Sequence, residues 1–112
     1  KDILFLHNEP IHYLNIIVEL KIENNVTQIN SIVELSNYLK DKNNFDLIII
    51  DILKLDIENL KEIILDTDNK FILINDNKDN IDEVLKSKIT LCIDKTLSKK
   101  EIINNIQGMF DE

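Results

Sequence analysis

Short apolar runs recur along the chain, and stretches of helical periodicity separate them. The runs span residues 2–6, 26–29, 46–50, 70–74 and 90–93. Within the third and fourth runs, residues 47–50 and 71–74 are continuously apolar rather than alternating with polar residues. Continuous apolar runs of this length are typical of strands that are covered on both faces, as in a parallel sheet. The pattern therefore predicts five strands in a buried parallel sheet.

The stretches between the runs carry helix signals. Ile11, Leu14, Val18 and Ile22 fall at positions i, i+3, i+7 and i+11, which predicts one stripe of a helix, and Pro10 suits its first turn. Later helices have recognisable starting residues. These are two capping boxes, at residues 31–34 and 98–101, a cap at Asp56, and a cap at Asp79 or Asn80. Alternation of strand and helix predicts an α/β domain with helices on both faces of the sheet.

Length, charge and cysteine usage limit the possible functions. The chain has 112 residues, which fits a single domain, and a net charge of −8 with a pI of about 4.7. Such an acidic domain is not expected to bind nucleic acid directly, since that binding depends on neutralising phosphates. No apolar run is long enough to span a membrane, and one cysteine cannot form an internal disulfide, so we expect a cytoplasmic location.

Polar residues follow the predicted strands, at the edge where open parallel sheets bind their ligands. In chain order these residues are His7, Asn8, Glu9, Asp51, Asn75 and Lys95. We find no Gly-rich phosphate loop and no nucleophile–base signature, so an independent enzyme is not expected. The two histidines, with no cysteine or third histidine near them, do not predict a metal site.

Four of these strand ends together resemble the receiver domain of response regulators. The stretch ILFLHNEP resembles the first strand and acid-pair turn of that family, and FDLIIIDI resembles the third strand, which ends in the phospho-accepting aspartate, here Asp51. The stretch FILIND resembles the fourth strand, and LCIDKT resembles the fifth strand with its lysine, here Lys95. The resemblance covers essentially the whole chain and implies a five-stranded parallel sheet in the order 2-1-3-4-5.

The sequence departs from the receiver pattern at the positions that carry the family's chemistry. In working receivers an acid pair and the phospho-accepting aspartate hold Mg²⁺, but here the pair reads His7 and Asn8, with Glu9 beside it. Mg²⁺ requires hard oxygen ligands and offsets the charge of the incoming phosphoryl group. We therefore expect Mg²⁺ binding to be weak or absent, with no other cofactor, and Asp51 to be a vestigial phospho-acceptor position.

The switch positions of the family are altered as well. The hydroxyl residue that moves toward the phosphoryl group is Asn75 here, and the aromatic residue of the fifth strand is Cys92. Asn75 can still donate a hydrogen bond, whereas Cys92 cannot act as a swinging aromatic ring. Cys92 is expected to be a small buried side chain rather than a redox sensor. A Lys95–Asp51 ion pair is expected to remain as structure, and His7 is expected to be a polar strand-end residue.

The resemblance implies an atypical receiver that works without phosphorylation, as the regulatory and dimerising part of a longer transcriptional regulator. The rest of that regulator would bind DNA. Relatives dimerise through their fourth helix, fifth strand and fifth helix, which here places a homodimer face on residues 79–88 and 91–110. Apolar residues for that face are Ile81, Val84, Leu85 and Ile106.

Two alternatives stay open. The first is a slow phospho-accepting receiver that takes phosphate on Asp51 from a histidine kinase in a two-component system. The second is a stand-alone module for protein contacts, with no DNA-binding part.

Overall fold

The computed structural model describes residues 1–41, 44–76 and 81–110. Strands and helices alternate from one end of the chain to the other, as the sequence predicts. The elements are β1 (Asp2–Leu6), α1 (Pro10–Leu20), β2 (Asn25–Ile29), α2 (Ile32–Asp41), β3 (Leu47–Asp51), α3 (Ile57–Leu65), β4 (Phe71–Asn75), α4 (Glu83–Lys88), β5 (Leu91–Asp94) and α5 (Lys99–Gly108). Within the described residues, no helix is both long and apolar enough to cross a membrane.

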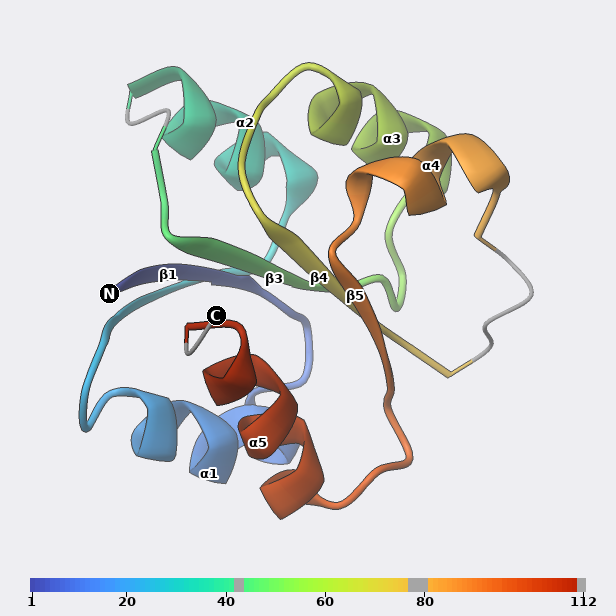
Figure 1. The fold of residues 1–112 in the computed structure, drawn as a ribbon. Coiled ribbons are helices and arrows are strands. Elements are labelled where there is room, and N and C mark those ends of the chain that lie inside the picture. Colours follow the sequence, from blue (N-terminus) through green and yellow to red (C-terminus); the bar gives the residue numbers. More distant parts are fainter. Residues whose placement is uncertain (42–43, 77–80, 111–112) are drawn as a thin grey trace.

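All five strands are parallel and lie in the order β2-β1-β3-β4-β5, so the predicted sheet and its order are confirmed. Helices α1 and α5 cover one face of the sheet, and α2, α3 and α4 cover the other (Figure 1). Strands β3 and β4 are buried along their whole length, which explains why their sequences are apolar without alternation. The carboxyl ends of all strands therefore meet at one edge of the sheet.

The alternation of side chains divides the core into two layers. On β3, Leu47 and Ile49 pack under α1 and α5, whereas Ile48 and Ile50 pack under α2, α3 and α4. Because successive side chains of a strand point to opposite faces, the parity of a residue decides which helices it meets. Asp51 lies on the same face of β3 as Leu47 and Ile49, because alternate residues share a face. Its side chain therefore points toward α1.

Hydrogen bonds at the helix starts confirm most of the predicted caps. Ser31 and Ser98 accept hydrogen bonds from the backbone of Glu34 and Glu101, and Asp56 caps α3. The prediction for α4 was wrong. Asp79 and Asn80 lie outside the described residues, and α4 is capped by Asp82, whose carboxylate accepts a hydrogen bond from the Leu85 amide at 2.8 Å. The reason is that the helix begins only at Glu83, directly after that carboxylate.

Helix α1 begins at Pro10 as predicted, but its predicted apolar stripe faces solvent. Ile11 is 88% exposed, and Leu14, Val18 and Ile22 are more than half exposed. The side chains that α1 buries against the sheet are Tyr13, Ile16, Ile17 and Leu20. These residues also have helical spacing, at i, i+3, i+4 and i+7, and this wider stripe is the one that packs against the sheet. Helix α1 is therefore apolar on two sides.

Candidate functional site

The candidate site is a buried polar cluster around Asp51, at the carboxyl end of the central strand β3. The Asp51 side chain is only 2% exposed, and both of its oxygens accept hydrogen bonds. Oδ1 accepts from the backbone amide of Leu53 at 2.9 Å, and Oδ2 accepts from the Tyr13 hydroxyl at 2.6 Å. The Lys95 ammonium lies 2.9 Å from the same Oδ2. The carboxylate is therefore held by three donors from three parts of the chain.

Lys95 connects two carboxylates. Its ammonium contacts Glu9 as well as Asp51, and its side chain is 9% exposed. Burial alone would lower the pKa of Lys95, but the hydrogen bonds to Glu9 and Asp51 outweigh burial and raise this pKa. Lys95 is consequently a cation that balances charges which would be costly alone in the interior. The predicted Lys95–Asp51 pair is present, whereas the contact with Glu9 was not predicted.

Tyr13 is the residue of this cluster that the sequence analysis missed. It is fully buried, projects from α1 and donates its hydroxyl proton to Asp51. Burial and this hydrogen bond to Asp51 raise the pKa of the Tyr13 phenol far above its ordinary value, so the hydroxyl remains a donor. The signal that could have found it is the buried stripe of α1, in which Tyr13 occupies the first position. Its ring also packs on Phe5 and His7.

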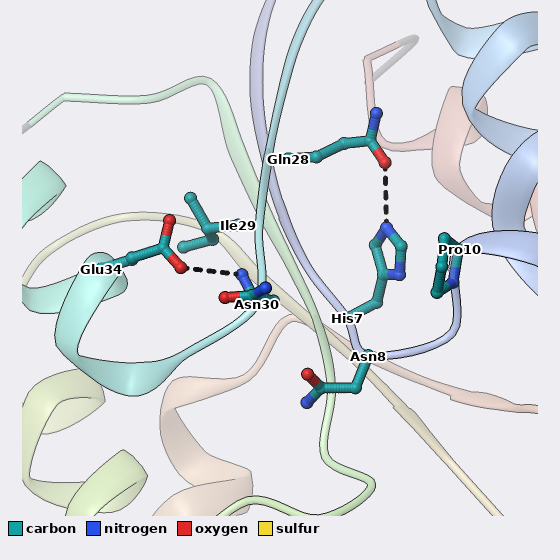
Figure 2. A pocket seen from close by; sticks show the side chains of 7 residues that line it. All are labelled: His7, Asn8, Pro10, Gln28, Ile29, Asn30 and Glu34. Carbon is teal, nitrogen blue, oxygen red and sulfur yellow. Dashed lines mark hydrogen bonds between the residues drawn. The ribbon is translucent and has the colours of Figure 1, made fainter.

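His7 is buried directly after β1, and its hydrogen-bond partners are Glu9 and Gln28. Its Nδ1 accepts a hydrogen bond from the Glu9 amide at 3.2 Å, which leaves the proton on Nε2. Nε2 in turn lies 3.1 Å from Oε1 of Gln28, to which it donates (Figure 2). Both ring nitrogens are thus used by the turn after β1 and by Gln28 on β2, so His7 does not pair with Asp51. The interpretation of His7 as a polar strand-end residue fits these contacts.

A shallow hollow of about 280 Å³ lies beside His7, between the ends of β1 and β2 and the start of α2. It is lined by His7, Asn8, Pro10, Gln28, Ile29, Asn30 and Glu34 (Figure 2). At the rim of this hollow, the Glu34 carboxylate accepts a hydrogen bond from the backbone N–H of Asn30. Asn8 is exposed and points away from the His7 ring. Of the two positions that resemble the acid pair of receiver domains, His7 therefore faces β2 and Asn8 faces solvent.

These residues do not fit a magnesium ion. Mg²⁺ prefers hard oxygen ligands, but His7 offers nitrogens that are already hydrogen-bonded. The carboxylates of Asp51 and Glu9 both contact the Lys95 ammonium, which a metal ion would have to displace. Across residues 1–41, 44–76 and 81–110, no three His, Cys, Asp or Glu side chains are grouped to hold a metal. Weak or absent Mg²⁺ binding stays a prediction.

The two switch positions lie apart from the tyrosine. Asn75 is buried at the end of β4, and Cys92 is partly buried on β5. Cys92 packs against the core layer under α2, α3 and α4, on the face opposite to Tyr13. Asn75 has the parity of Phe71 and Leu73, which belong to that same layer. The switch positions therefore belong to a different layer of the fold from Tyr13.

The predicted dimer-face residues are not all at the surface. Ile81, Leu85 and Ile106 are buried in the core of the domain, at 5%, 0% and 0% exposure, and only Val84 is exposed. These three side chains face inward because each lies on the side of its segment that packs against the sheet. Pairing through this side of the molecule stays a prediction, and of the four residues only Val84 can reach a partner.

The turn after β3 contains a strained residue. Lys54 has a φ of 65°, in the left-handed region that a non-glycine residue rarely adopts, and the Leu55 amide donates to the Ile52 carbonyl across the turn. Such a turn favours glycine at this position.

We expect Lys54→Gly to stabilise the domain by roughly 0.5–1 kcal/mol in urea unfolding, since the left-handed conformation costs L residues about 1–2 kcal/mol and glycine entropy offsets part of the gain. Lys54→Ala is the control and should give no such gain.

Solved receiver domains superimpose on almost the whole chain. A response regulator receiver domain from Clostridium thermocellum is 24% identical, with a TM-score of 0.76 over 97% of this chain and 93% of that one. The BeF₃-activated N-terminal receiver domain of Klebsiella pneumoniae RstA is 14% identical, with a TM-score of 0.77 over 100% of both chains. The chain has the response-regulator receiver fold. A LuxR family DNA-binding response regulator from Silicibacter pomeroyi shares this receiver fold at 17% identity, with a TM-score of 0.73 over 99% of this chain and 93% of that one.

No protein-family model matches the chain, and no curated protein sequence matches it. The similarity to receiver domains is therefore one of fold, at low sequence identity. This fold places Asp51, Lys95 and the turn after β1 at one edge of the sheet, as the sequence analysis predicts. The contact of Lys95 with Asp51 was predicted, whereas those of Lys95 with Glu9 and of Tyr13 with Asp51 were not.

Proposed function

We propose that the chain is a regulatory receiver-fold domain that signals through protein contacts and does not require phosphorylation of Asp51. The observation that carries this proposal is that both oxygens of the Asp51 carboxylate already accept hydrogen bonds within the domain. Its Oδ2 accepts hydrogen bonds from Tyr13 and Lys95, its Oδ1 accepts one from Leu53, and the side chain is almost fully buried. A phosphoryl group would have to displace the tyrosine and find compensation for its charge without a fitting metal site.

Further parts of the proposal rest on similarity and charge. The Silicibacter pomeroyi neighbour is a DNA-binding response regulator, which supports a role in transcriptional regulation for a longer protein that contains this domain. The net charge of −8 supports the view that another part of the longer protein, and not this domain, binds DNA. We place the domain in the cytoplasm and expect it to form a homodimer, because a regulator without a phosphorylation switch needs another way to control its contacts.

The test is the intact mass of the domain after incubation with acetyl phosphate and Mg²⁺. We expect no phosphoryl adduct on the wild type, because the Asp51 nucleophile is held by Tyr13 and Lys95. Circular dichroism of the same sample establishes that it is folded.

Two variants make the result specific. Asp51→Asn removes the acceptor, and Asp46→Asn, directly before the start of β3, is the matched control. An adduct on the wild type and on Asp46→Asn, but not on Asp51→Asn, would contradict the proposal. It would instead support a slow phospho-accepting receiver served by a histidine kinase.

A further inference from the structure

Helix α1 and the turn after it carry four of the nine large hydrophobic side chains that are exposed among the described residues. Ile11, Leu14 and Val18 on α1, together with Ile22 in the turn directly after it, form what we call the α1 stripe, and each is 57–88% exposed. The other large apolar residues exposed to a similar degree lie on other helices, Val33 on α2 and Val84 on α4. On a typical monomer the largest apolar patch is about 300–600 Å², and it often marks an interaction site.

From this stripe we infer that two copies of the domain pair through α1, with the two helices antiparallel. The inference rests on the homodimer in the proposed function and names the face that forms it. An isologous contact requires a surface that is complementary to itself. The α1 stripe meets this requirement because its spacing is nearly the same when read from either end.

The register follows from the spacing. In an antiparallel pair centred between residues 16 and 17, Ile11 lies level with the partner's Ile22, and Leu14 and the partner's Val18 lie within one residue of the same level, a difference of about 1.5 Å. Every large side chain of the stripe then has an apolar residue across from it. A standard interface buries about 800 Å² per partner, so the stripe supplies the apolar centre and neighbouring polar residues supply the rim.

The charges within α1 and the turn after it favour a second copy over a strongly basic partner. Although the chain carries 21 acidic residues, only Glu19 and Glu23 fall between residues 10 and 24, together with Lys21. This part of an acidic molecule is nearly neutral, so two copies meet here with little repulsion between like charges. In the antiparallel register, Glu19 also comes close to the partner's Asn15.

The position of α1 leaves it accessible for such a contact. Its buried side is occupied by the sheet and α5, which lie next to it in Figure 1. The stripe is exposed, whereas Tyr13, which contacts Asp51 and Lys95, lies on the buried side of the same helix. Pairing there would require no rearrangement of the buried cluster, which suits a contact that is independent of phosphorylation.

The test is sedimentation velocity over a range of concentrations, with one glutamate placed on each candidate face. We expect the wild type to dimerise and Val18→Glu to weaken the dimer roughly a hundredfold, since two-fold symmetry places each substitution twice in the interface. Val33→Glu on α2 is the matched control, and Val84→Glu examines the face of α4. All three positions are exposed, and circular dichroism checks that each variant is folded.

The outcomes separate the inference from the proposed function. Loss of the dimer with Val18→Glu alone supports pairing through α1. A dimer that survives Val18→Glu but is lost with Val84→Glu would overturn this inference and leave the proposed homodimer intact. A wild type that stays monomeric at every concentration would overturn both the inference and the homodimer.

Disulfide cross-linking tests the orientation of the helices. In a Cys92→Ser background, a mixture of Leu14→Cys and Val18→Cys chains should form more mixed dimers than dimers of either chain alone, because Leu14 faces the partner's Val18. A preference for 14–14 and 18–18 links would indicate parallel helices and overturn the antiparallel register. This measurement does not depend on introducing a charge.

Discussion

Replacing Lys95 by methionine is expected to destabilise the domain by about 3–5 kcal/mol, because it leaves Asp51 buried without a counter-ion. The ammonium lies 2.9 Å from Asp51 Oδ2 and also contacts Glu9, and the aspartate is 2% exposed. Methionine keeps the volume of the side chain, so the measured loss reports the charge rather than a cavity. Urea unfolding followed by circular dichroism gives the free energy of unfolding.

A double variant isolates the cause of this loss. Adding Asp51→Asn to Lys95→Met removes the unpaired charge, so the double variant should be more stable than Lys95→Met alone. The control is Lys99→Met on the exposed surface of α5, which should change the stability by less than about 0.5 kcal/mol. If the double variant were the least stable of the three, the charge balance around Lys95 would not be the cause.

The stability difference between wild type and Lys95→Met should also depend on pH in a definite direction. The folded domain raises the pKa of Lys95 above the ordinary value of 10.5, through the hydrogen bonds to Glu9 and Asp51 that outweigh burial. A group with a raised pKa contributes stability that is fully present below its unfolded pKa and is lost as the pH rises through its folded pKa. The difference should therefore stay constant from neutral pH to about pH 10 and narrow only above that.

Removing only the hydroxyl of Tyr13, with Tyr13→Phe, is expected to cost about 1.5–3 kcal/mol, the usual range for a hydrogen bond to a charged group. The hydroxyl donates to Asp51 Oδ2 at 2.6 Å, and the fully buried ring packs from α1 onto Phe5 of β1. Phenylalanine keeps the packing of the ring on Phe5. The loss of unfolding free energy therefore measures the hydrogen bond from the Tyr13 hydroxyl to Asp51.

The second tyrosine of the chain provides the matched control. Tyr38 lies on α2 and is 39% exposed, so Tyr38→Phe should leave the free energy of unfolding within about 0.5 kcal/mol of wild type. In an Asp51→Asn background the cost of Tyr13→Phe should shrink, because the acceptor no longer carries a charge. An equal cost in both backgrounds would mean that the Tyr13 hydroxyl does not act through Asp51.

The sheet was predictable because continuous apolar runs have few interpretations in a chain of this length. The first run, at residues 2–6, coincides with β1, whereas the third and fourth strands begin and end one residue later than their runs. The shift brings Asp51 and Asn75 into the strands. Pairing of a strand's backbone with its neighbour does not require an apolar side chain, so Asp51 pairs with Ile74 and Asn75 pairs with Asp94.

The contacts of the site could not be predicted in the same way, and α1 illustrates why. Its sequence contains two apolar stripes, and amphipathic spacing alone does not say which stripe meets the sheet. Choosing the stripe that begins at Ile11 hid Tyr13, and with it the donor on Asp51. The contact of His7 with Gln28 was also out of reach, because it depends on the rotamer of a residue on another strand.

The uninterrupted apolar character of β3 and β4 has a consequence for the unfolded chain. The sequences LIII and FILI carry no charge and no proline, a composition typical of segments that stack into intermolecular sheets once exposed. In the native domain both strands are buried, with charged residues only at their ends, so this tendency is suppressed. Heating should therefore end in aggregation rather than reversible melting, and variants at Lys95 or Tyr13 should show it first as a lower yield of soluble protein.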